Sequence, residues 1–164
     1  MSAFQLAQLN IAIMKHSLDA PEMADFVNNL DPINVLAESS PGFVWRLKDE
    51  AGDATSLRPM GENTLVNMSV WKDVESLNQY TYHTAHLEIM KRRKEWFDHM
   101  KEVHMVLWWV RAGHRPDVYE AIAKLELLRA KGPTAEAFTF RRAFPAPDAA
   151  QSSSSFELGD ECPA

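Results

Sequence analysis

The chain has 164 residues, of which 46% are hydrophobic and 24% are charged, a composition typical of one globular domain. Its formal net charge of -6 argues against a nucleic-acid partner, because neutralising phosphates requires a basic surface. The single cysteine, Cys162, excludes an intrachain disulfide and suits a reducing compartment. Residues 1–4 show no secretion signal, and no apolar run approaches the roughly 20 residues that span a bilayer. We therefore expect a cytoplasmic protein with no membrane partner.

Hydrophobic periodicity predicts an alternation of strands and helices along the chain. In chain order we expect a strand over residues 5–14, a helix over 21–38, strands over 43–48 and 65–71, a helical stretch over 74–100, a strand over 103–111, a helix over 117–131 and a short strand over 138–144. Asp19 and Asp73 are expected to cap the first two helices. Pro32 is expected to break or kink the first helix, and the second is expected to break near residues 83–85.

The C-terminal segment differs in composition from the rest of the chain. Residues 145–164 contain prolines, four consecutive serines and scattered acids, which cannot bury a core. We expect a single domain over residues 3–144, followed by a disordered tail over 145–164.

The order β-α-β-β-α-β predicts the ferredoxin-like α+β fold, with an extra C-terminal helix and short strand. In the strand over residues 103–111, both faces are apolar: one carries Met105, Leu107 and Trp109, and the other carries Val106, Trp108 and Val110. Helices on one side of the sheet leave the other side bare, so both faces need cover. The simplest second cover is the same face of another copy. We therefore expect a homodimer that forms a dimeric α/β barrel.

Polar residues gather on one face of the other three strands. If the apolar faces contact the helices, the polar faces line the inside of the barrel, with Gln8, Asn10, Arg46, Asn67 and Ser69. A few polar groups among aromatic rings are typical of a ligand pocket, and we expect Trp45, Trp71 and Trp108 to form its walls. The alternative is that these amides satisfy neighbouring backbone groups or form dimer contacts.

A second group of candidates lies on the predicted helix over residues 74–100. His83 and His86 are three residues apart, so they are neighbours on a helix and are the best acid/base candidates. A zinc site needs three or four protein ligands and no cysteine joins them, so we predict no metal. Arg93 and Phe97 continue the stripe from His86, where they would meet an anionic or carbonyl-bearing ligand. The alternative is a histidine satisfied by backbone or water.

Several segments together resemble a bacterial family, DUF3291, a domain of unknown function in the dimeric α/β-barrel superfamily. The segments are residues 7–12, 42–47, 66–71, 92–97, 107–110, 113–116 and 138–142. The resemblance covers the ordered chain and implies the ferredoxin-like fold and a dimer, with no established activity.

A shorter likeness concerns residues 69–73 and the helix that follows, up to Tyr80. This segment looks like the strand-to-helix segment of antibiotic-biosynthesis-type monooxygenases, small dimeric barrels of which many need no cofactor and some degrade haem. The haem-degrading branch uses an Asn on the first strand, which Asn10 matches, and a Trp and a later His on the second helix. Tyr80 stands at the Trp position and Met90 near the His position, a departure from that pattern.

These observations favour an enzyme that carries out a monooxygenase-type oxidation of a small aromatic or carbonyl-bearing molecule. His83 or His86 would act as acid or base, while Asn10, Asn67 and Arg46 would orient a carbonyl or enolate, and no cofactor is predicted. The alternatives are a non-catalytic ligand-binding or stress-related dimer and a haem-binding protein.

Overall fold

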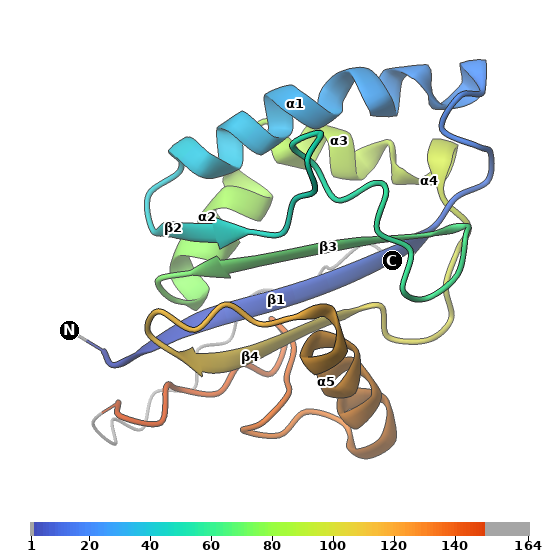
Figure 1. The fold of residues 1–164 in the computed structure, drawn as a ribbon. Helices are drawn as coiled ribbons and strands as arrows, with labels where there is room; N and C mark the ends of the chain where they lie inside the picture. Colours follow the sequence, from blue (N-terminus) through green and yellow to red (C-terminus); the bar gives the residue numbers. More distant parts are fainter. Residues whose placement is uncertain (1, 150–164) are drawn as a thin grey trace.

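Strand β1 (Phe4–Ile13) runs through the centre of an antiparallel sheet in the computed structural model, which describes residues 2–149 (Figure 1). It pairs with β3 (Thr64–Trp71) on one side and with β4 (Met105–Arg111) on the other, and β2 (Phe43–Arg46) lies beyond β3. The sheet order β2-β3-β1-β4, with helices between the strands, confirms the predicted ferredoxin-like α+β fold.

Helices cover both faces of this sheet (Figure 1). One face lies beneath α1 (Ala24–Ser39), α2 (Val74–His83), α3 (His86–Lys91) and α4 (Arg93–Trp96), and the short 3-10 helix η1 (Pro21–Met23) leads into α1. The opposite face is covered by α5 (Val118–Lys131). The helices therefore form two unequal layers around one sheet.

The expected cap of the first helix is wrong, and the expected break at Pro32 is absent, while a kink there stays a prediction. Asp19 caps nothing, because η1 begins after Ala20 and neither η1 nor α1 has a side-chain cap. Pro32 lies inside α1 and does not end it. Pro32 is exposed, so water can satisfy the carbonyl that loses its helical N–H partner. By contrast, Asp73 caps α2 as predicted, accepting a hydrogen bond of 2.8 Å from the Ser76 backbone N–H.

The expected break near residues 83–85 is present, and it separates α2 from α3. Thr84 is extended at this point. Its hydroxyl donates to the Tyr80 carbonyl at 2.5 Å and accepts a 3.3 Å hydrogen bond from the His86 N–H. His83 and His86 are therefore not neighbours on one continuous helix, as the spacing had suggested. The helical stretch also ends at Trp96 rather than at residue 100.

The predicted last strand over residues 138–144 is reduced to one β-bridge. Phe138 exchanges both backbone hydrogen bonds with Leu107 at 2.8 Å, and the chain then turns, with the Arg142 N–H donating to the Thr139 hydroxyl. Beyond it, the Asp148 carboxylate accepts 2.7 Å hydrogen bonds from Ser2 and Ala3 at the other end of the domain. The remainder of the predicted disordered tail, residues 150–164, lies outside the described residues.

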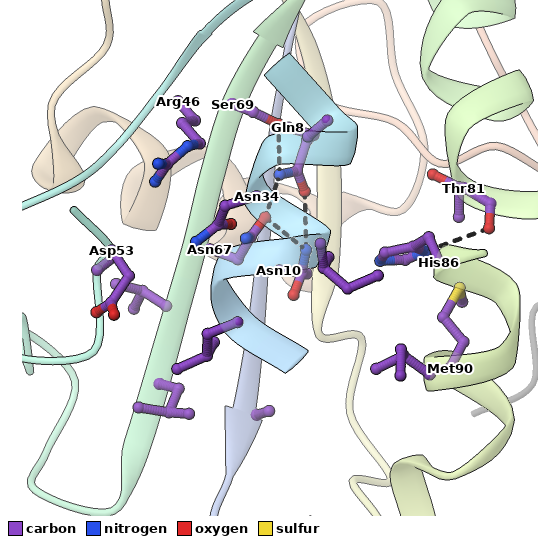
Figure 2. Close-up of a pocket in the computed structure, with 18 of the residues that line it drawn as sticks. Gln8, Asn10, Asn34, Arg46, Asp53, Asn67, Ser69, Thr81, His86 and Met90 are labelled. Atoms are coloured by element: carbon purple, nitrogen blue, oxygen red, sulfur yellow. Dashed lines mark hydrogen bonds between the residues drawn. The ribbon is translucent and has the colours of Figure 1, made fainter. Parts of the chain in front are cut away.

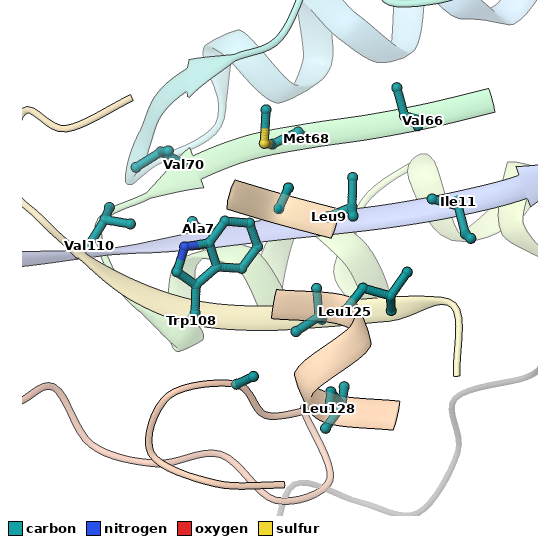
Figure 3. Packing of buried hydrophobic residues seen from close by; sticks show 13 residues of the cluster. Ala7, Leu9, Ile11, Val66, Met68, Val70, Trp108, Val110, Leu125 and Leu128 are labelled. Atoms are coloured by element: carbon teal, nitrogen blue, oxygen red, sulfur yellow. The ribbon is translucent and has the colours of Figure 1, made fainter. Parts of the chain in front are cut away.

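The apolar face of the sheet is buried within one chain (Figure 3). Leu125 and Leu128 of α5 pack on the odd-numbered side chains of β1 and on Trp108, which is 1% exposed. The argument that a second copy must cover this face is therefore wrong, because α5 and the flanking loops already do so. The assignment of faces was reversed as well: α1–α4 contact the polar face. The homodimer stays a prediction.

Candidate functional site

A cavity of about 250 Å³ lies between the polar face of the sheet and the α1–α4 layer. Its floor is formed by β1 and β3, through Gln8, Asn10, Asn67, Ser69 and Trp71. One face of α1 forms the roof, because its lining residues, including Phe26, Leu30, Ile33 and Ala37, recur at helical spacing. Asn67 is exposed, so the cavity opens beside it.

The polar floor is one hydrogen-bonded network (Figure 2). The Gln8 amide donates to Asn67 Oδ1 at 2.7 Å and to Ser69 Oγ at 2.9 Å. Asn10 Nδ2 donates to Gln8 Oε1 at 3.0 Å and to Asn67 Oδ1 at 3.2 Å. Trp71 Nε1 donates to Ser69 Oγ at 2.9 Å. The register explains the network, because Gln8 lies opposite Ser69 and Asn10 lies opposite Asn67 across the β1–β3 ladder.

Counting donors and acceptors shows what this network leaves for a ligand. Both N–H bonds of Gln8 and of Asn10 are used, and Asn67 Oδ1 already accepts two hydrogen bonds. Within the described part of the chain, the Asn67 amide hydrogens and the Ser69 hydroxyl hydrogen have no acceptor, and Asn10 Oδ1 has no donor. The floor therefore offers donors at Asn67 and Ser69 beside one acceptor at Asn10.

Three stacked rings form one wall of the cavity. Trp71 stacks on Tyr80 at 5.0 Å between centroids, and Tyr80 contacts the His86 ring at 4.9 Å. Burial raises the pKa of the Tyr80 phenol, although the Arg46 charge acts in the opposite direction. Tyr80 therefore remains a neutral phenol, and its hydroxyl donates to the Ile33 carbonyl of the roof at 3.4 Å.

His86 is held in one tautomer and one charge state. Its Nδ1 lies 3.2 Å from the Thr81 carbonyl oxygen, which can only accept, so Nδ1 carries the hydrogen. Burial lowers the pKa of His86, and the Thr81 hydrogen bond only partly offsets this, so the ring is neutral at pH 7. Nε2 thus carries a lone pair and has no hydrogen-bond partner among residues 2–149. This is the arrangement of a general base.

Charged side chains lie on one side of the amide network and uncharged ones on the other (Figure 2). Arg46 and Asp53 lie on one side, and His86 and Met90 lie on the other. Arg93 also lines the cavity and stands 5.6 Å from the Phe97 ring. His104 lines it too, and burial together with the Arg93 charge lowers the pKa of His104, so this ring is also neutral at pH 7. The formal charges of the lining are therefore two guanidinium groups and one carboxylate.

Most of the predicted site residues meet at this cavity: Asn10, Arg46, Asn67, Ser69, Trp71, Tyr80, His86, Arg93 and Phe97. Three do not line it. His83 is exposed at the end of α2. Trp45 and Trp108 are paired with Val70 and Ala7 in the sheet, so they point to the opposite face, into the α5 core. These two predicted walls were placed on the wrong face.

Sequence reasoning missed six lining residues with Asn, Asp, Thr or His side chains: Asn29, Asn34, Asp53, Thr55, Thr81 and His104. Asn34 lies four residues after Leu30 on α1, so the two share one helix face, and the helical spacing in the sequence could have identified Asn34. Thr81 orients His86 through its backbone carbonyl, for which no side-chain pattern exists. Over residues 2–149, no three metal-binding side chains come close enough to share an ion, and no helix has the length and apolarity needed to cross a membrane.

The fold and the cavity together define a ferredoxin-like α+β domain with a partly polar cavity that opens beside Asn67. More particularly, the chain belongs to the family described as domain of unknown function DUF3291, whose profile matches residues 5–154. The segments that resemble this family in the sequence predicted this membership. No curated protein sequence matches the chain.

Two solved proteins are similar to the chain at low identity. One is NE2512, a protein of unknown function from Nitrosomonas europaea, with 13% identity, a TM-score of 0.44, and coverage of 70% of this chain and 94% of that one. The other is SnoaB, a cofactor-independent oxygenase from Streptomyces nogalater, with 15% identity, a TM-score of 0.43, and coverage of 69% and 97%.

Proposed function

We propose that this protein is a cofactor-independent monooxygenase-type enzyme that oxidises a small, planar, carbonyl-bearing or aromatic substrate, with His86 as the general base. One observation carries the proposal: a half-buried neutral imidazole, fixed by the Thr81 carbonyl, keeps its Nε2 lone pair beside a cavity that also offers oriented donors. The lowered pKa keeps the ring unprotonated and able to accept a proton at pH 7, and adjacent hydrogen-bond donors would stabilise the enolate that forms when a proton leaves carbon.

The chemistry follows from these groups. Nε2 of His86 takes a proton from a CH₂ group next to a carbonyl, and the enolate oxygen accepts hydrogen bonds from Asn67 and Ser69. Donors that are already oriented are worth on the order of 3 kcal/mol at such an oxyanion. Asn10 Oδ1 is free to accept from a substrate hydroxyl, which would fix the ring in the cavity.

Dioxygen is the only co-reactant that this route needs. The enolate transfers one electron to O₂, and the two radicals combine to form a carbon–oxygen bond. The resulting peroxide takes a proton from the His86 imidazolium. Loss of the second C–H proton then breaks the O–O bond and releases water. The CH₂ group becomes C=O, so one oxygen atom enters the product and the other leaves as water.

The test uses the purified full chain with 2-tetralone and 1-naphthol as enolisable and phenolic probes. We expect enzyme-dependent oxygen uptake with at least one probe. His86→Gln is expected to lower it by about 100-fold or more, in the range of a lost general base. His83→Gln is the matched control, because His83 is exposed and does not line the cavity. Full turnover in His86→Gln would refute the role of the base.

A second outcome separates catalysis from binding. If both probes bind but neither consumes oxygen, the chain is a non-catalytic ligand-binding protein, which is the alternative expected from the sequence. The haem alternative fits less well. The cavity of about 250 Å³ is small for a porphyrin, and Tyr80 and Met90 depart from the residues of the haem-degrading pattern.

Two further expectations from the sequence remain predictions. A cytoplasmic location follows only from the sequence arguments. The packing reason for expecting a homodimer no longer holds, because α5 covers the apolar face of the sheet. Sedimentation equilibrium of the purified chain would determine whether it is a dimer.

A further inference from the structure

Arg46 lines the cavity with hydrogen-bonding capacity that the described chain does not use. It is at the end of β2, opposite Ser69, and it lines the cavity with a side chain that is 13% exposed. Its single partner in the described structure is Glu38 of α1. Nε donates to Glu38 Oε1 at 2.7 Å, and Nη2 lies 2.7 Å from the same oxygen in an ion pair. Both contacts therefore meet one acceptor atom, and the other guanidinium N–H bonds have no acceptor in the described chain.

Glu38 satisfies Arg46 poorly. Its side chain is 43% exposed and does not line the cavity, so solvent weakens the pair. Nη1 has no hydrogen-bond acceptor among residues 2–149 and is not fully enclosed, so a ligand in the cavity can reach it in place of water. A planar carboxylate is the acceptor that matches two parallel N–H bonds of a guanidinium.

The charges around the cavity also favour an anion. Among the described residues that line the cavity, Arg46 and Arg93 are positively charged and Asp53 is the only carboxylate. Both lining histidines, His86 and His104, are neutral at pH 7. The Asp53 carboxylate is engaged elsewhere, because its Oδ1 accepts from the Thr55 N–H at 2.8 Å and from the Thr55 hydroxyl at 2.6 Å. The described lining residues thus carry two guanidinium groups against one carboxylate, within a protein whose net charge is -6.

We propose that the ligand of this cavity is a planar aromatic carboxylate, with its carboxylate on Arg46 and its ring against the Trp71–Tyr80 wall. This inference rests on the proposed function for the assignment of the cavity as a substrate site, and it deepens that function by naming the substrate class. The carboxylate competes with Glu38 for the guanidinium, because both require the same donors. The ring then extends across the amide network toward His86 on the far side (Figure 2).

The experiment measures equilibrium binding by isothermal titration calorimetry with two probes, naphthalene-2-carboxylate and naphthalene-2-carboxamide. They share the ring and differ in charge, so the ratio of their affinities isolates the contribution of the anion. We expect the wild-type chain to bind the carboxylate about tenfold or more tightly, the range of a charge-assisted hydrogen bond. Arg46→Gln is expected to bring the ratio close to one, and Arg46→Lys is expected to keep part of it.

Two charge variants of α1 sharpen the test. Glu38→Gln removes the competitor, so we expect the carboxylate preference to rise by a few-fold, a gain that damage to the fold would not produce. Asp25→Asn is the matched control, because it removes the ion pair of α1 with Arg92 at 2.8 Å, and neither residue lines the cavity. We expect it to leave the affinity ratio unchanged, even if it loosens α1.

Three results would overturn the inference: equal affinity for the two probes, a carboxylate preference that persists in Arg46→Gln, or no binding of either probe at millimolar concentration. Its failure is distinct from failure of the proposed function. Oxygen uptake that depends on His86 can persist without any carboxylate preference, and a carboxylate preference can be measured in a chain that consumes no oxygen.

Discussion

Leu125 tests whether α5 of the same chain covers the apolar face of the sheet. It is 0% exposed and packs among the side chains of β1, β3 and β4. Leu125→Ala removes three carbon atoms, Cγ and its two methyl groups, and leaves a void that close packing only partly fills. We expect a loss of about 2–5 kcal/mol in the free energy of unfolding. For a domain of this size each kcal/mol shifts the melting temperature by roughly 2–4 °C, so the midpoint should fall by about 4–20 °C.

Urea unfolding followed by circular dichroism measures this loss, and Tyr119→Ala provides the control. Tyr119 is on the same helix but is 77% exposed, so we expect its removal to change stability by no more than about 0.5 kcal/mol. A loss below about 1 kcal/mol for Leu125→Ala would refute the cover by α5, since buried leucines cost more. A large loss for Tyr119→Ala would show that the outer face of α5 is buried against another molecule, which would revive the homodimer.

The remaining predictions concern pH and a turn. Turnover is expected to be constant above pH 6.5 and to fall as the pH drops through the lowered pKa of His86, because only the neutral ring accepts a proton; a pH–rate profile checks this. The free energy of unfolding should also fall as the pH drops below 6.5, because His86 binds a proton in the unfolded chain at its ordinary pKa of 6.5, before it does so in the folded chain. Urea unfolding of His86→Gln should therefore depend less on pH. Gly42→Ala is expected to destabilise the fold more than Gly113→Ala: both have positive φ, at 83° and 90°, but only a Cβ on Gly42 would collide with Ser76. Equal losses of unfolding free energy for the two glycine variants would contradict this reasoning.

The local patterns predicted the elements and the fold class but not every boundary. Period-two alternation located all four strands, and helical spacing located α1 and α5 within a few residues. The break at Thr84 agrees with the expectation from the sequence. It separates His83 from His86, because residues three apart are neighbours only within one continuous helix. Pro32 failed as a breaker because the environment of an exposed helix face tolerates it.

The candidate site shows a similar division. Asn10, Asn67 and Ser69 were recognised from their common face on paired strands, and the register of β1 and β3 brings them into hydrogen-bonding contact. Thr81 could not be found, because it acts through a backbone carbonyl whose position depends on where α2 ends. Asp53 lies in a loop without periodicity, so no pattern connected it with Arg46.

By itself, the sequence determined which side chains share a face, since alternation along a strand and spacing along a helix follow from backbone geometry alone. It also determined the ferredoxin-like order of elements. Only the tertiary structure decided which layer each face meets, because that choice depends on where α5 packs after β4. By taking the apolar face, α5 left the polar face to α1–α4, and this placed His86, Arg46 and the amide network around one cavity.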